Sequence, residues 1–137
     1  MIKLNNVYKS YVSNNNSQVV LTDISLSCPK SGLFFIVGKS GCGKSTLLNI
    51  LGGLDTIDQG SYQFHDLYVN TLNQLQLDAF RNTHIGFVFQ EYHMIETMTI
   101  LDVLKYTSIA SSGTYSLDHI KQLLTDLELD EDMNKYP

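Results

Sequence analysis

One short segment of the sequence combines glycines, a lysine and a hydroxyl side chain in a spacing that binds phosphate. Residues 38–45 read GKSGCGKS, a glycine, four variable residues, and then Gly-Lys followed by Ser or Thr. The glycines let the backbone turn tightly, so that successive N–H groups point at a phosphate group. Lys44 is suited to bridge β- and γ-phosphate oxygens, and the Ser45 hydroxyl is suited to hold Mg²⁺. The segment therefore predicts a site for a nucleoside triphosphate with magnesium.

The elements expected on either side of this segment are those that a phosphate-binding loop requires. LFFIV (33–37) predicts a strand buried on both faces, and residues 45–51 predict a helix that stops at GGLD (52–55). A helix that starts after Gly43 directs its positive dipole end at the phosphate. The alternative is a chance glycine turn, and the full match between strand and helix argues against it.

Two further residues of the segment have their own interpretations. Thr46 is placed to add a contact toward the α-phosphate. Cys42 is predicted to be there for packing, because the variable positions accept small residues, although a helix N-terminus does lower a thiol pKa and leaves a redox role as the alternative.

The chain before the loop predicts a β-hairpin. Residues 2–12 and 18–28 alternate apolar and polar side chains, as half-buried strands do. The polar SNNNS (13–17) is predicted to be the turn between them, and PKSG (29–32) a second turn. After the loop, residues 58–69 predict a short strand and turn.

The rest of the chain becomes increasingly helical. LNQLQLDAFRN (72–82) has helical spacing, and HIGFVFQ (84–90) predicts a second compact strand. Residues 99–110 predict a helix that opens with Thr99 and Asp102 in a capping arrangement. Residues 116–129 predict a helix with one apolar stripe, formed by Leu117, Ile120, Leu123, Leu124 and Leu127.

Composition excludes several classes of function. The chain has 137 residues and a formal net charge of −5, which argues against a nucleic-acid partner because backbone binding needs a basic surface. Its apolar runs are far shorter than the ~20 residues of a membrane span. Cys28 and Cys42 form neither a disulfide framework nor a zinc pattern, and the histidines, His93 among them, are too scattered to hold a metal. A reduced, cytosolic setting is the expectation.

Three stretches together resemble the ATP-binding subunit of ABC transporters. They are DISL (23–26), LFFIVGKSGCGKSTLLNILGGLD (33–55) and IGFVFQEYHMIETMTILDVL (85–104). The wording LGGLD and GFVFQ is most similar to the subgroup that serves macrolide exporters, lipoprotein-release systems and peptide exporters or sensors. The resemblance implies an α/β fold: a P-loop NTPase (ABC ATPase) core with an N-terminal antiparallel β-subdomain and the start of a helical subdomain. Residues 1–90 would form the core, and residues 91–137 the Q-loop region with the first part of the helical subdomain.

The resemblance also assigns roles to individual residues. Tyr11 would stack on adenine, with Tyr8 as the competing candidate. Gln90 would be the Q-loop glutamine that supplies an oxygen to Mg²⁺ and places the attacking water; an ordinary glutamine at a strand end is the alternative. Lys44 and Gln90 are thus the expected catalytic residues, and Ser45 and Gln90 the expected metal ligands. The residues expected to bind ATP are Tyr11, Gly38, Ser40, Gly41, Cys42, Gly43, Lys44, Ser45 and Thr46.

The same resemblance implies partners and a location. Residues 91–99 would face a transmembrane permease subunit, with Met94, Ile95 and Met98 either forming that contact or belonging to a helical core. The full-length protein would act as a homodimer of ATPase subunits, cytoplasmic and peripheral at the inner face of the cell membrane.

The chain departs from the family pattern after NKYP (134–137), where an LSGGQ signature, a Walker B strand ending in Asp-Glu and a switch histidine are expected. Without them we expect ATP binding but no hydrolysis, an unpaired side on the strand 33–37, and association through the exposed surfaces. A nucleotide-binding regulatory module and a small P-loop kinase are the alternative functions. The kinase would need a basic lid, which the nine lysines and arginines do not form.

Overall fold

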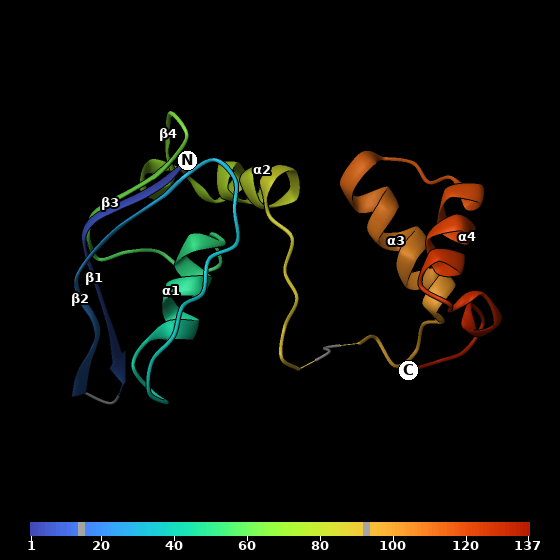
Figure 1. Cartoon of the computed structure of the whole chain (residues 1–137), viewed down its shortest axis with the longest axis horizontal. Helices are drawn as coiled ribbons and strands as arrows, with labels where there is room; N and C mark the ends of the chain where they lie inside the picture. The colour runs from blue at the N-terminus through green and yellow to red at the C-terminus, as the bar shows by residue number, and fades with distance from the viewer. Residues whose placement is uncertain (14–15, 92–93) are drawn as a thin grey trace. The chain divides into compact units, whose positions relative to one another are not determined.

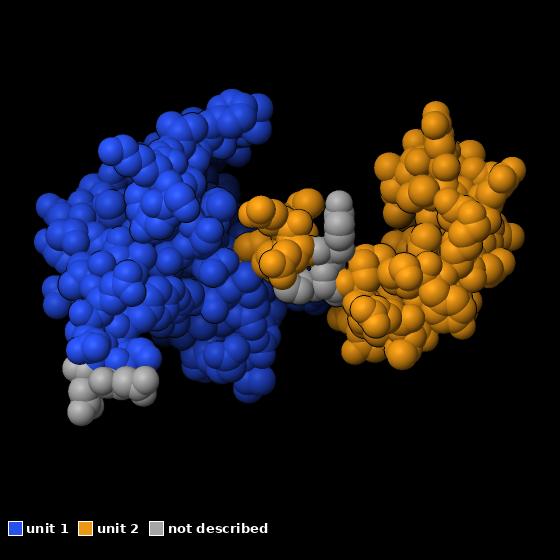
Figure 2. Space-filling model, turned by 90° about the horizontal axis from the view of Figure 1, so that it is seen from below, with its two compact units in different colours: residues 1–86 blue, residues 87–137 orange. Residues whose placement is uncertain are grey.

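The structure, a computed structural model, describes residues 1–13, 16–91 and 94–137 (Figure 1). It divides into two compact units, Met1–Gly86 and Phe87–Pro137, which Figure 2 colours separately. The functional boundary expected after Gln90 stays a prediction. The loop predicted at 13–17, the segment predicted to face a permease and His93 lie partly or wholly outside the described residues.

A four-stranded antiparallel sheet forms the frame of the first unit. Its order is β2-β1-β3-β4, and the predicted hairpin is confirmed, because β1 pairs with β2 from Ser13↔Asn16 to Ile2↔Cys28. The predicted short strand and turn become β3 and β4. The strands are β1 (Ile2–Ser13), β2 (Asn16–Cys28), β3 (Gln59–Phe64) and β4 (Leu67–Tyr68).

A bulge in β1 decides which of its side chains face the core. Leu4 and Val7 are both buried although three positions separate them, and the register with β2 shifts between these two residues. At the bulge, Asn6 has a φ of 48° and its N–H donates to the Ser25 hydroxyl at 2.9 Å. An extra residue in one strand reverses the alternation beyond it. Val7 and Lys9 therefore share the buried face of the strand.

Two helices and one turn of 3₁₀ helix cover this sheet (Figure 1). The predicted helices are confirmed as α1 (Lys44–Leu51) and α2 (Gln74–His84), with η1 (Val69–Thr71) between β4 and α2. Asn73 begins α2 through a reciprocal capping box with Gln76. The buried core consists of Leu4, Val7, Leu21, Leu47, Ile50, Tyr62, Val69, Leu77 and Phe80.

One hydrogen bond ties the sheet to the end of α1. The buried Tyr62 hydroxyl donates to the carbonyl oxygen of Leu51 at 2.6 Å. Carbonyls in the last turn of a helix have no partner within the helix, so this bond satisfies one of them inside the core. The helix that begins at Lys44, directly after the glycine loop, is thereby fixed at its far end.

Two strands predicted from the sequence are wrong. Residues 33–37 lie in an extended loop, where Val37 is 85% exposed, and residues 85–89 lie outside any strand, with His84 ending α2. Within residues 1–13, 16–91 and 94–137, neither segment pairs with another strand. A strand exists only where a neighbour takes up its N–H and C=O groups, and hydrophobic sequence does not supply that neighbour.

The second unit is helical. It contains α3 (Ile100–Ser112), α4 (Leu117–Asp126) and η2 (Asp130–Asp132). The Thr99 hydroxyl accepts the N–H of Asp102 at 3.2 Å, as the capping arrangement predicted, and Gly113 ends α3 in a left-handed conformation. No helix among the described residues is long and apolar enough to cross a bilayer.

Helix α4 buries only part of its predicted apolar stripe. Ile120 and Leu124 are buried, whereas Leu117, Leu123 and Leu127 are exposed. The helix also ends before the predicted residue 129, because Glu128 adopts a φ of 58° and the N–H of Leu129 turns back to the Leu124 carbonyl at 2.8 Å.

Candidate nucleotide-binding site

The loop at residues 38–43 is shaped by glycines in conformations that other residues avoid. Gly41 has a φ of 76° and Gly43 a φ of 92°, both in the left-handed region. Gly43 is the N-cap of α1, and no side chain caps that end of the helix. The first N–H groups of α1 therefore remain available to donate to an external acceptor, as they do at helix ends that bind anions.

The loop packs closely against β2. A Cβ on Gly43 would lie 2.8 Å from Leu21 Cδ2 and 3.0 Å from the Val20 carbonyl oxygen. A Cβ on Gly38 would lie 2.7 Å from Cys42 Sγ. A side chain at either position would therefore have to displace a neighbouring atom. Cys42 is exposed with its sulfur beside Gly38, and the packing role predicted for it stays a prediction.

Lys44 bends back over the loop. Its ammonium donates to the carbonyl oxygens of Gly38 at 3.0 Å and Lys39 at 2.8 Å. The charge therefore lies at the mouth of the turn, where a phosphate oxygen would compete with two carbonyls for it.

The hydroxyl side chains predicted for the site line the same part of the molecule. Ser40 is exposed in the turn, Ser45 is exposed on the first turn of α1, and Thr46 follows it half-buried. Of these, Thr46 contacts a residue from another element, because its hydroxyl interacts with the Tyr11 side chain.

Tyr11 comes from the end of β1 and is held at its hydroxyl. Its O–H donates to Asp55 Oδ2 at 2.6 Å, and its ring is 42% exposed. The competing candidate, Tyr8, is half-buried and pairs with Gln59 in the sheet. The structure thus brings Tyr11 together with the start of α1, through Thr46, and leaves part of its ring open.

Lys9 lies beneath this tyrosine and is nearly buried, with 7% of its surface exposed. Its ammonium donates to Asp55 Oδ1 at 2.7 Å and to the Thr56 carbonyl oxygen at 2.7 Å, and Asp58 Oδ1 lies 3.9 Å away. It also lies 5.2 Å from the centre of the Tyr11 ring. A buried ammonium is tolerated because anionic and carbonyl oxygens surround it.

These contacts shift the pKa values of Asp55, Tyr11 and Asp58. Burial works against ionisation of Asp55, but hydrogen bonds from Lys9, Tyr11 and the Thr56 N–H outweigh it and lower its pKa. The hydrogen bond to Asp55 raises the pKa of Tyr11, which stays a neutral donor. The hydroxyl and N–H of Ser10 lower the pKa of Asp58.

Sequence reasoning missed Lys9 and Asp55. Two signals were available. Lys9 stands two positions after Val7 and two before Tyr11, so a charged residue occupies an apolar face. Asp55 is the last residue of GGLD (52–55), the segment at which α1 stops. Neither signal names the partner, because β1 and residues 52–58 meet only in the folded chain.

Comparison with known proteins places the chain in a family. A family model described as ABC transporter matches residues 21–137, most of the chain. The chain belongs to the ABC transporter family. The α/β fold class expected from the sequence agrees with this membership and with the structural comparison below.

Similar members of this family are ATP-binding proteins. The chain is 35% identical over 139 residues to the bacitracin export ATP-binding protein BceA of Halalkalibacterium halodurans, covering 100% of this chain and 55% of that protein. It is 34% identical over 134 residues to the lipoprotein-releasing system ATP-binding protein LolD of Buchnera aphidicola, covering 96% of this chain and 58% of that protein. The chain thus spans little more than half the length of these relatives.

A solved structure shows the same fold. The ATP-binding cassette MJ0796, a dimer in a post-hydrolysis state bound to ADP and Pi, superposes with a TM-score of 0.88 at 31% identity. The match covers 100% of this chain and 62% of that one. The described residues of this ABC transporter family member therefore adopt the fold of an ABC ATPase cassette over that part.

Gln90, the remaining predicted site residue, belongs to the second unit. It is exposed in a bend that follows the extended residues 85–89, where the rings of Phe87 and Phe89 stack with their centroids 5.2 Å apart. All other predicted site residues belong to the first unit. Of the apolar residues after Gln90, Met94 and Ile95 are exposed and Met98 is half-buried.

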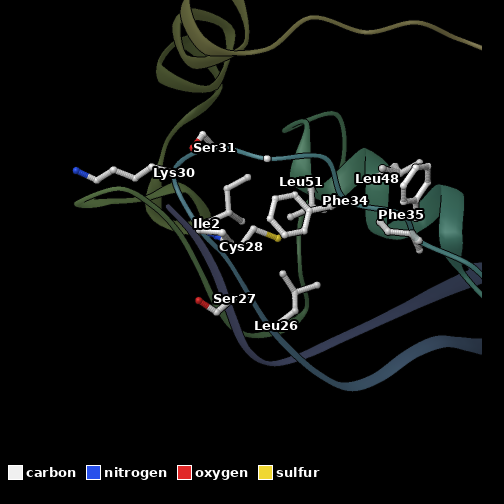
Figure 3. Close-up of a pocket in the computed structure, with 13 residues that line it drawn as sticks. Ile2, Leu26, Ser27, Cys28, Lys30, Ser31, Phe34, Phe35, Leu48 and Leu51 are labelled. Atoms are coloured by element: carbon white, nitrogen blue, oxygen red, sulfur yellow. The ribbon is translucent and has the colours of Figure 1, made fainter.

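The first unit also has an apolar groove, which we define by Ile2, Leu26, Cys28, Phe34, Phe35 and Leu48 (Figure 3). Its volume is about 650 Å³. It lies between the end of β2, the extended residues 33–37 and α1. Its lining is mostly apolar, with Lys30 as its one charged residue, and it includes none of the loop residues 38–43.

Proposed function

We propose that this chain is the nucleotide-binding part of an ABC transporter ATPase and that it binds MgATP. The observation that supports the proposal is that one compact unit contains both a loop suited to phosphates and an aromatic ring suited to a base. A glycine loop with an uncapped helix and Lys44 at its mouth fits phosphates, and an open tyrosine ring linked to Thr46 fits a base. BceA and LolD, named as ATP-binding proteins, support the same assignment.

In this proposal each predicted residue has a defined task. The loop N–H groups from Gly38 to Gly43 and the Lys44 ammonium bind the β- and γ-phosphates, Thr46 contacts the α-phosphate, and Tyr11 stacks on adenine. Ser45 and Gln90 offer hydroxyl and amide oxygens, the hard ligands that Mg²⁺ prefers. When bound, the cation neutralises charge on the phosphates.

The whole protein is proposed to use ATP to drive export or extraction of a substrate by a membrane permease. BceA is named for bacitracin export and LolD for lipoprotein release, and MJ0796 is a dimer. By analogy the full-length protein would dimerise and lie on the cytoplasmic face of the membrane. Residues after Gln90 would meet the permease, which the exposure of Met94 and Ile95 favours over a core role.

We further propose that these 137 residues alone bind ATP without hydrolysing it. An Asp-Glu pair does occur, at Asp130 and Glu131, but it lies in η2 and not at the end of a strand. No LSGGQ sequence is present. Loss of a general base alone costs ~10²–10⁴ in rate. Magnesium-dependent turnover near one per second that Lys44→Ala abolishes would contradict this proposal.

Calorimetric titration with MgATP tests the binding function. Lys44→Ala should weaken binding at least tenfold, about 1.4 kcal/mol, because it removes the cation at the mouth of the loop. Lys39→Ala is the matched control: it removes an exposed lysine from the same loop but leaves the carbonyl that accepts from Lys44. Binding that survives Lys44→Ala as well as it survives Lys39→Ala would overturn the proposal.

A further inference from the structure

The buried charge in the first unit is connected to the base-binding tyrosine. Lys9 is the buried charged residue of the described chain, and its ammonium has two partners at 2.7 Å, Asp55 Oδ1 and the Thr56 carbonyl. No buried side-chain nitrogen or oxygen among the described residues lacks a hydrogen-bond partner. Because an unpaired buried ammonium is costly, Lys9 keeps Asp55 in one place.

Asp55 is fixed from its own backbone as well. Its Oδ1 accepts the Thr56 N–H at 2.7 Å, and its N–H donates to the Asn49 carbonyl oxygen of α1 at 3.2 Å. One carboxylate oxygen is therefore committed to Lys9 and Thr56. The other, Oδ2, points to Tyr11 and accepts its hydroxyl proton at 2.6 Å.

We propose that Asp55, held by Lys9, is a positioning residue that orients the Tyr11 ring for the nucleotide base. Tyr11 lies near the C-terminal end of β1 with its ring partly exposed, so without a hydrogen bond to its hydroxyl the ring would sample several rotamers. A tether at the hydroxyl leaves the face of the ring accessible while it removes that freedom. Preorganising a binding group in this way strengthens binding, because less conformational entropy is lost when the ligand arrives.

The inference rests on the proposed function, since it requires that Tyr11 receives a base. It adds a chain of contacts from the core of the sheet, through Lys9 and Asp55, to the surface that meets the ligand. Its consequence is confined to the base end of a nucleotide. The phosphate end depends on the loop and on Lys44, whose ammonium donates to the carbonyl oxygens of Gly38 and Lys39.

The test compares two ligands that share a phosphate chain but differ in the base. MgATP and magnesium tripolyphosphate are titrated calorimetrically into the wild type, Tyr11→Phe, Asp55→Asn and the double variant. Tyr11→Phe keeps the ring and the Lys9–Asp55 pair; it loses the bond to Asp55 and the contact of the hydroxyl with Thr46, whereas Asp55→Asn leaves the Thr46 contact in place. We expect ATP affinity to fall threefold to tenfold in each single variant and tripolyphosphate affinity to stay within twofold of the wild type.

The double variant and a control sharpen this result. Because both substitutions remove the same bond between Tyr11 and Asp55, the double variant should bind ATP no more weakly than the single variant with the lower ATP affinity. Tyr8→Phe removes a tyrosine hydroxyl from the same strand and should change neither affinity. Asp55→Asn replaces the anionic partner of Lys9 with a neutral amide, and circular dichroism shows whether this variant is still folded. If it is not, Tyr11→Phe decides the question.

The outcomes separate the two proposals. If Tyr11→Phe binds ATP as the wild type does while Tyr11→Ala binds it more weakly, the proposed stacking of Tyr11 on the base is supported and the positioning role of Asp55 is overturned. Equal weakening for ATP and tripolyphosphate would also overturn it, because the effect would then be general. If the wild type binds neither ligand, the proposed function itself falls, and the inference with it.

Discussion

Gly41 and Gly43 have similar backbone angles but different surroundings. Both have a positive φ, which costs a residue with a side chain roughly 1 kcal/mol. A Cβ on Gly41 would meet nothing within 4 Å, whereas one on Gly43 would lie 2.8 Å from Leu21 Cδ2. The two glycines therefore serve the loop differently, one through conformation alone and the other through conformation and space.

Alanine at these two positions separates the two costs. We expect Gly41→Ala to lower the free energy of unfolding by about 1 kcal/mol, and Gly43→Ala by more, since overpacking adds about 1–3 kcal/mol. Urea denaturation followed by circular dichroism measures both. Equal losses would mean that β2 yields to the added methyl group and that the close packing of the loop carries no cost.

Asp55 should make the free energy of unfolding depend on pH in the acid range. Its folded-state pKa is lowered, so the ionised carboxylate stabilises the fold above its unfolded pKa of about 3.9, and that contribution is lost as the pH falls through the lower folded value. The wild type should therefore lose stability below about pH 4, and Asp55→Asn should lose less over that range. Urea unfolding between pH 6 and pH 2.5 gives the slopes, with Asp58 contributing the remainder in both proteins. Identical slopes would contradict the assignment.

At the scale of elements, the sequence predicted well what local rules determine. The hairpin from Ile2 to Cys28, the helix after the glycine loop and the Thr99 cap all follow from alternation, periodicity and capping chemistry. The strands predicted at 33–37 and 84–90 were wrong, because a strand depends on a neighbouring strand that the segment's own sequence does not encode. The contact between Lys9 and Asp55 was not predicted for a related reason: it joins residues that are 46 positions apart.

Helix α4 offers a matched pair of neighbouring leucines. Leu124 is 1% exposed and Leu123 is 39% exposed, although the sequence placed both on the apolar stripe. Leu124→Ala should destabilise the second unit by about 2–5 kcal/mol, and Leu123→Ala by clearly less, because only the first leaves a cavity. Hydrogen exchange of the α3 and α4 amides measures this locally. Equal loss of protection would show that Leu123 is covered in solution.

At the scale of the whole molecule, the first unit combines the candidate nucleotide site with a large apolar surface. The groove and the extended residues 33–37 expose phenylalanine, leucine and valine side chains together. Contiguous apolar surface of this kind drives association. Ile2 of β1 and Leu26 of β2 line the groove, and Tyr11 lies further along β1, so the groove and the tyrosine share one sheet.

Self-association through this surface is therefore expected. Sedimentation velocity should show larger species as the protein concentration rises, and Phe35→Glu should shift the population toward monomer because it places a charge in the groove. Val88→Glu is the control, because Val88 is an apolar residue outside the groove that is even more exposed than Phe35. A wild type that stays monomeric at high concentration would contradict the prediction, as would an equal effect of the two substitutions.

The two free cysteines stand at the two surfaces of the first unit that matter most. Cys42 is exposed inside the glycine loop, and the half-buried Cys28 lines the apolar groove. Each thiol can react with an alkylating reagent, and each is shielded when its own surface is covered. The rate of modification at Cys42 therefore records occupation of the loop, and the rate at Cys28 records covering of the groove. The native sequence thus contains two independent chemical reporters, which mass spectrometry can read from one sample.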